Sequence, residues 1–100
     1  MKVNKEFVDI DGIKTAYIKR DGGKKIVVIL HGWGAYIESI MPIFNSVPED
    51  YTVYAYDAPG FGDSDDPSFV MGTYDYYEFL LKFLEKFSIK KATFIGHSFG

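Results

Sequence analysis

The chain has 100 residues, which is room for one small domain with a hydrophobic core and too few for two. Its composition, 47% hydrophobic and 25% charged, excludes a disordered chain, and the absence of cysteine excludes disulfides and thiolate metal sites. A net charge of -3 without a dense block of Lys or Arg argues against nucleic acid or an acidic membrane surface as a partner.

The N-terminal stretch predicts a β-hairpin. It lacks the long apolar segment of a signal peptide, and the chain has no run long enough to cross a bilayer, so we expect a cytoplasmic protein with no membrane partner. Two alternating apolar and polar runs, Lys5–Ile10 and Ile13–Lys19, flank Asp11-Gly12. Because Asp-Gly tolerates the positive φ angles of a tight turn, these runs are predicted to pair as antiparallel strands.

The next segment predicts a buried strand, a glycine-rich loop and a short helix. Ile26–Leu30 reads IVVIL, a continuous run typical of a strand covered on both faces, and HGWG follows it. The stretch ESIMPIFNSV favours a helix with Ser39 as its N-cap and Pro42 in its first turn, where the missing N–H does little harm. The side chains expected on its inner face are Ile40, Phe44 and Val47.

A fourth strand, a longer helix and a fifth strand complete the chain. Tyr51–Asp57 is the fourth predicted strand and continues into the turn-rich loop APGFGDSDDP. Thr73 is expected to cap a helix over residues 74–87, and KKATFI, residues 90–95, is a short apolar strand. The residues at helical spacing that we expect to face the core are Tyr77, Leu80, Leu81, Leu84 and Phe87.

The order of these elements predicts an α/β fold. From Ile26 onward strands and helices alternate, which favours a parallel sheet joined by right-handed crossovers. With the N-terminal hairpin, this gives a three-layer α/β/α arrangement whose mostly parallel sheet begins with an antiparallel pair. No repeat, low-complexity tract or linker interrupts the sequence, so residues 1–100 are expected to belong to a single domain.

GHSFG, residues 96–100, fits the pattern G-x-S-x-G and directly follows the fifth predicted strand. A serine on a sharp strand-to-helix turn projects its hydroxyl clear of the sheet, and bulky residues two positions away on either side would collide. The backbone N–H of the following residue points toward the same spot. A second N–H donor for an oxyanion is expected from the loop after the third strand, where HGWG stands. This pattern predicts that Ser98 is a nucleophile.

Three motifs in order, LHGWG, YDAPGFGDS and GHSFG, each after a predicted strand, resemble the α/β-hydrolase family. The resemblance implies the N-terminal half of that fold, with Ser98 as nucleophile, oxyanion-hole N–H groups on Trp33 and Phe99, and no cofactor. The glycines that the elbow and the oxyanion loop would require are Gly32, Gly96 and Gly100. Serine at the nucleophile position favours attack on an acyl bond of a small molecule, in an ester, thioester or amide-like group.

The resemblance also implies that part of the catalytic apparatus lies outside this chain. The family places its acid and its catalytic histidine after the nucleophile, beyond Gly100 here. Its strand order of 1-2-4-3-5-6-7-8 would leave the fifth strand as a bare edge, open to a missing C-terminal half or to another copy. We therefore expect residues 1–100 to be the N-terminal part of a longer α/β-hydrolase domain and to be inactive alone.

Two residues near the predicted site have open roles. His31 follows the third strand and Asp57 ends the fourth, so a relay of Ser98, His31 and Asp57 within the chain is one interpretation. The other is that the His31 ring orders the oxyanion loop through its nitrogens. His97 adjoins Ser98 in sequence, so its side chain should point away from the hydroxyl and be a poor base.

The chemistry and the acidic loop also have alternative interpretations. Resembling proteins with the same elbow include cofactor-free haloperoxidases, carbon–carbon bond hydrolases and lyases. A chain without a complete relay could also be an inert or partner-binding half. Asp63, Asp65 and Asp66 lack the spacing of a calcium loop, so we expect a solvated loop and no metal site.

Overall fold

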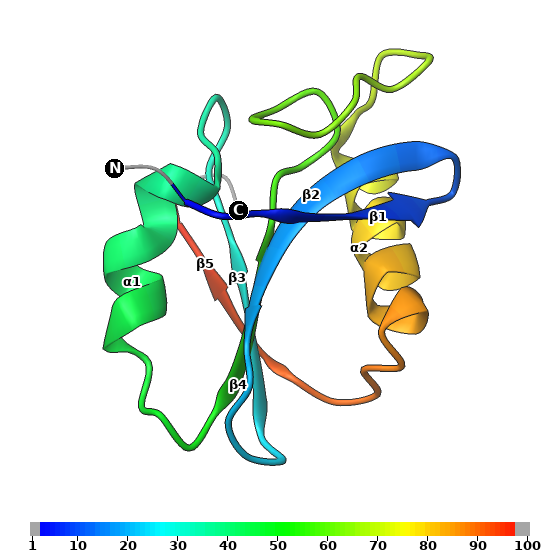
Figure 1. The fold of residues 1–100 in the computed structure, drawn as a ribbon. Coiled ribbons are helices and arrows are strands. Elements are labelled where there is room, and N and C mark those ends of the chain that lie inside the picture. Colours follow the sequence, from blue (N-terminus) through cyan, green and yellow to red (C-terminus); the bar gives the residue numbers. More distant parts are fainter. Residues whose placement is uncertain (1–2, 98–100) are drawn as a thin grey trace.

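A computed structural model describes residues 3–97 of the chain, and Figure 1 shows the arrangement of its elements. Ser98, Phe99 and Gly100, which include the predicted nucleophile, lie outside the described residues. In chain order the elements are β1 (Glu6–Ile10), β2 (Ile13–Arg20), β3 (Ile26–Leu30), the 3-10 helix η1 (Ile37–Ile40), α1 (Met41–Ser46), β4 (Thr52–Tyr56), α2 (Thr73–Lys86) and β5 (Thr93–Gly96).

The strands form one mixed sheet in the order β1-β2-β4-β3-β5. β1 pairs with β2 and β2 with β4 in antiparallel fashion, whereas β3 pairs with both β4 and β5 in parallel. Figure 1 shows α1 on one face of the sheet and α2 on the other, which makes three layers. The predicted three-layer α/β fold, its N-terminal hairpin and its strand order are confirmed.

The hairpin turn has the backbone that its sequence predicts. Asp11 has a φ of 52° and Gly12 a φ of 85°, and the register pairs Ile10 with Ile13. Two successive residues with positive φ match the right-handed twist of the flanking strands, which explains why Asp-Gly occupies this turn.

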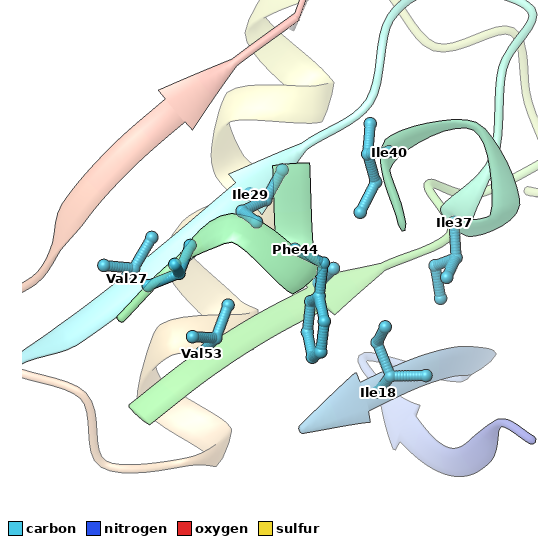
Figure 2. Close-up of a cluster of buried hydrophobic side chains, with 9 residues drawn as sticks. Ile18, Val27, Ile29, Ile37, Ile40, Phe44 and Val53 are labelled. Atoms are coloured by element: carbon cyan, nitrogen blue, oxygen red, sulfur yellow. The ribbon is translucent and has the colours of Figure 1, made fainter. Parts of the chain in front are cut away.

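One half of the core lies between the sheet and the segment made of η1 and α1. Ile37, Ile40 and Phe44 are buried against the alternate side chains of β3 and β4, as Figure 2 shows. The residues of this cluster are Ile18, Val27, Ile29, Ile37, Ile40, Phe44, Val47, Val53 and Ala55. The predicted inner face of this helical segment is therefore confirmed.

The other half of the core is a stack of aromatic rings between the sheet and α2. Tyr56 packs with ring centroids 4.5 Å from Phe83 and 5.3 Å from Phe79, and both phenylalanines are buried. Tyr77 and Leu81, by contrast, are 52% and 41% exposed. The predicted inner face of α2 was wrong for these two residues, because α2 is apolar on more than one side and periodicity alone does not choose the row that meets the sheet.

Both predicted N-caps were wrong. The Ser39 hydroxyl lies inside η1, where it donates to the carbonyl of Tyr36 at 2.6 Å, and the N-cap of α1 is Ile40. Thr73 is the first residue of α2, and the cap is Gly72, whose N–H donates to Asp75 Oδ2 at 2.9 Å. In both cases a side chain three residues later accepts a hydrogen bond from the backbone N–H of the cap residue. Ser39 Oγ accepts from Tyr36 at the start of η1, and Asp75 accepts from Gly72 at the start of α2.

The loops that follow β3 and β4 lie at the same edge of the sheet, because these strands are parallel neighbours (Figure 1). Residues 31–36 and 57–72 therefore approach each other there, and the N-terminus of α2 adjoins them. Among residues 3–97, no helix has the length and apolar character needed to cross a bilayer.

Candidate active site

The HGWG loop is a tight turn that presents Trp33. The N–H of Ala35 donates to the carbonyl of Gly32 at 3.0 Å, and Gly34 has a φ of 75°. A positive φ at this third position of a turn favours glycine. The Trp33 indole is 63% exposed and meets the rings of Phe61 and Tyr76 edge to face, with centroids 5.0 and 6.1 Å away. The sequence predicted a role for Gly32 in this loop but not for Gly34, although the G-x-G spacing is a signal for such a turn.

His31 uses both ring nitrogens on backbone groups. Its Nε2 accepts a hydrogen bond from the N–H of Ala58 at 3.0 Å, so the ring proton is on Nδ1, which donates to the carbonyl of Gly32 at 2.8 Å. The ring is buried and ties the start of the HGWG loop to the residue after Asp57. In this arrangement neither nitrogen is available to take a proton from a serine, which argues against the relay through His31.

Asp57 is a completely buried carboxylate at the end of β4. Its Oδ1 accepts a hydrogen bond from the N–H of Ile37 at 2.7 Å, and its Oδ2 accepts from the N–H of Asp63 at 3.0 Å and from Lys5 Nζ at 2.8 Å. These partners come from three separate segments of the chain. Asp57 thus joins the N-terminal segment, the start of η1 and the loop after β4, and its contacts are structural ones.

Lys5 lies at the centre of a cluster of three carboxylates, Glu38, Asp57 and Asp63, which we call the carboxylate cluster. Its Nζ is 2.8 Å from an oxygen of each, and its side chain is only 4% exposed. Burial by itself lowers the pKa of Lys5, but the hydrogen bonds to the three carboxylates outweigh burial, and the pKa is raised. The Lys5 ammonium group is thus the cation that these three carboxylates bind. Among residues 3–97, no group of His, Cys, Asp or Glu side chains is arranged to hold a metal ion.

Gly62 is placed directly against the Asp57 carboxylate. Gly62 has a φ of 53°, and a Cβ on it would overlap the carboxyl group. Gly62→Ala is therefore expected to lower the free energy of unfolding by about 2–4 kcal/mol, from backbone strain plus displacement of Asp57. Gly12→Ala is the matched control, since Gly12 also has positive φ but has open space around it. Equal losses in denaturant titrations of the two variants would contradict the packing argument.

The end of the described chain lies beside the HGWG loop. Gly96 of β5 is in register with Leu30 of β3, and the N–H of His97 donates to the carbonyl of Leu30 at 3.1 Å. His31 follows Leu30 directly, so the residue before Ser98 is hydrogen-bonded to the residue before the loop. Ser98, Phe99 and Gly100 themselves lie outside the described residues.

A pocket of about 270 Å³ lies beside Trp33, at the ends of β3 and β4 and against the first turns of α2. Its lining is mostly aromatic and aliphatic, and includes Leu30, Trp33, Tyr56, Phe61, Tyr76 and Leu80. The Tyr76 hydroxyl donates to the carbonyl of Pro59 at 3.3 Å, which holds this wall to the loop after β4. The pocket suits an apolar group rather than a charged one.

Alkaline pH is expected to destabilise the fold. Burial raises the pKa of Tyr56, and the carboxylate cluster, despite burial, raises that of Lys5. Both groups stabilise the fold fully below their unfolded-state pKa values, about 10, and this stabilisation is lost as the pH rises above them. Denaturant titrations should show a free energy of unfolding that falls above about pH 10, and Tyr56→Phe should flatten the fall. An identical fall in wild type and variant would show that Tyr56 does not contribute.

Most of the polar contacts around this site were not predicted from the sequence. Lys5 stands 52 residues from Asp57, and no local pattern links the two. For Gly62 a signal was present, because glycines in the turn-rich loop APGFGDSDDP mark positions where a positive φ is expected.

The chain matches the family described as alpha/beta hydrolase fold over residues 25–100, and it belongs to this family. It is 30% identical over 95 residues to the dihydrolipoyllysine-residue acetyltransferase component of the acetoin cleaving system of Cupriavidus necator, a match covering 95% of this chain and 25% of that protein. It is 27% identical over 93 residues to the uncharacterized hydrolase YugF of Bacillus subtilis, covering 91% of this chain and 34% of that protein.

A solved structure of a membrane phospholipase A, described as a bacterial virulence factor, has the same fold. It superposes with a TM-score of 0.86 at 27% identity, covering 97% of this chain and 32% of that chain. The present chain therefore spans between a quarter and about a third of the length of these three proteins.

Proposed function

We propose that the protein carrying this chain is a serine hydrolase that cleaves an acyl bond of a small molecule, with Ser98 as nucleophile. The observation that carries the proposal is the hydrogen bond from the N–H of His97 to the carbonyl of Leu30, at 3.1 Å. It brings the position before Ser98 to the start of the loop that bears Trp33. An elbow serine and a loop N–H donor on neighbouring strands are what acyl transfer requires.

In this proposal the Ser98 hydroxyl gives its proton to a histidine beyond residue 100, and Oγ bonds to the acyl carbon. The N–H groups of Trp33 and Phe99 stabilise the oxyanion, and the leaving group takes the proton as it departs. Water then hydrolyses the acyl-enzyme and restores the serine. The proposal needs no cofactor. The apolar pocket beside Trp33 supports an apolar acyl or leaving group.

The exposed edge of the sheet supports the part of the proposal that extends beyond this chain. β5 is the last strand in the sheet order, and Phe94 on it is 46% exposed. An apolar edge strand of this kind is a site for further strand pairing. We infer that the remainder of a longer domain covers it, including the acid and the histidine of the relay.

A fluorophosphonate probe tests the proposal on the full-length protein. The probe should label Ser98 covalently, and peptide mass spectrometry of the adduct identifies the residue. Absence of labelling in folded protein would contradict the proposal. Labelling at Ser98 without hydrolysis of p-nitrophenyl esters would instead favour one of the alternative reactions of the same nucleophile, which are peroxide-dependent halogenation, carbon–carbon bond hydrolysis and a lyase reaction.

A further inference from the structure

We infer that Lys5 and the carboxylate cluster hold the HGWG loop in its working position, so that Lys5, Glu38 and Asp57 are positioning residues for the oxyanion donor on Trp33. The inference rests on the proposed function. It assigns a role in that function to an N-terminal lysine outside all three hydrolase motifs.

The loop from residue 31 to residue 36 is held at both ends by two consecutive residues, Asp57 and Ala58. At its start, the N–H of Ala58 donates to His31 Nε2 at 3.0 Å. At its end, the Oδ1 of Asp57 accepts from the N–H of Ile37 at 2.7 Å. The position of Trp33 between these ends therefore depends on where the chain after β4 places the Asp57 carboxylate.

Lys5 holds that carboxylate in position and supplies its counter-charge. Its Nζ bonds Asp57 Oδ2 and Glu38 Oε1, both at 2.8 Å, so the same ammonium holds Asp57 and the first turn of η1. The third carboxylate, Asp63, belongs to the loop that closes over Asp57. Without Lys5, a completely buried carboxylate would lose its counter-charge, and η1 would lose its second tie to the site.

Movement of the loop should affect the transition state more than the bound substrate. An N–H donor in an oxyanion hole is aimed at the position that the charged oxygen takes in the tetrahedral intermediate, not at the ground-state carbonyl. A small shift of Trp33 therefore weakens oxyanion stabilisation, lowers kcat and leaves KM nearly constant. General destabilisation would instead reduce the number of active molecules.

The experiment compares three variants of the full-length protein. Lys5→Met removes the ammonium group, and Glu38→Gln weakens only the tie to η1 at a side chain that is 30% exposed. Lys19→Met is the matched control, because Lys19 on β2 forms an exposed pair, at 3.1 Å, with Asp21 just after the strand. The concentration of active sites is first titrated with the fluorophosphonate. The kcat and KM for p-nitrophenyl butyrate are then measured, with Ki values for butyrate and for a trifluoromethyl ketone that forms a tetrahedral adduct.

For Lys5→Met we expect kcat per titrated site to fall about tenfold and the Ki of the ketone to rise by the same factor, with KM and the butyrate Ki changed by less than about twofold. Glu38→Gln should shift the same two quantities by a smaller factor, about threefold. Lys19→Met should shift neither.

Two results would overturn the inference. One is an unchanged ketone Ki in Lys5→Met, or in Glu38→Gln should Lys5→Met fail to fold. The other is a loss of activity accounted for entirely by fewer titratable sites, which a purely structural role would produce. Failure of the proposed function is distinguishable from both, because wild-type protein would then show neither labelling nor inhibition by the ketone.

Discussion

Replacing Ser98 by alanine is expected to lower kcat for an ester substrate by a factor on the order of 10⁴ or more and to abolish fluorophosphonate labelling. The reason is that alanine removes the oxygen that attacks the acyl carbon in the first step of the proposed mechanism, so no acyl-enzyme can form. The remaining oxyanion donors and the binding surface would still accelerate direct attack by water to some extent, so residual turnover need not be zero. Initial rates with p-nitrophenyl butyrate measure the effect.

The control for this prediction is Ser46→Ala. Ser46 is at the end of α1 and its hydroxyl donates to the carbonyl of Ile43, so the variant alters a serine away from the proposed site. It should keep wild-type rates and labelling. Hydrolysis by Ser98→Ala at the wild-type rate would exclude Ser98 as the nucleophile and, with it, the proposed mechanism.

Asp57→Ala is expected to cause a large loss of stability, about 3–5 kcal/mol in the free energy of unfolding. The carboxylate is completely buried, and its removal leaves the Lys5 ammonium with a weaker set of partners. It also leaves the N–H groups of Ile37 and Asp63 without their acceptor. Denaturant titration of the full-length protein measures the loss.

Two further variants test this prediction, one that separates charge from hydrogen bonding and one that serves as an exposed control. Asp57→Asn keeps an oxygen acceptor but not the negative charge, so it should lose less stability than Asp57→Ala. Asp21→Ala removes an exposed carboxylate that also pairs with a lysine, and it should leave the unfolding midpoint nearly unchanged. If Asp57→Ala unfolded at the same denaturant concentration as Asp21→Ala, the structural role of the buried carboxylate would be wrong.

Much of the fold could be predicted because its signals are local. Asp11-Gly12 encodes a hairpin through two positive φ angles, and IVVIL encodes a strand that is buried on both faces. The strand order was predicted through the family resemblance, not from these local patterns. The motif that placed Ser98 after β5 is also local, although Ser98 itself lies outside the described residues.

Caps and helix faces were harder to predict because several residues compete for each role. Ser39 is a good N-cap by type, yet its hydroxyl bonds Tyr36 inside a 3-10 turn that precedes α1. On α2, Tyr77 and Leu81 are large and mainly apolar, as Phe79 and Phe83 are, and contact with Tyr56 on the sheet selects the phenylalanine row.

Hydrophobic periodicity, turn residues and short motifs act over a few neighbouring residues, so the sequence was enough to predict the class of fold and to propose an elbow at Ser98. The contacts that support the candidate site became evident from the three-dimensional structure alone, which joins segments far apart in the chain. It assigned the His31 nitrogens to two backbone groups and brought Lys5 to Asp57 across 52 residues. Such contacts depend on which distant segments the sheet order brings together, and a buried charge leaves no local pattern that identifies its partner.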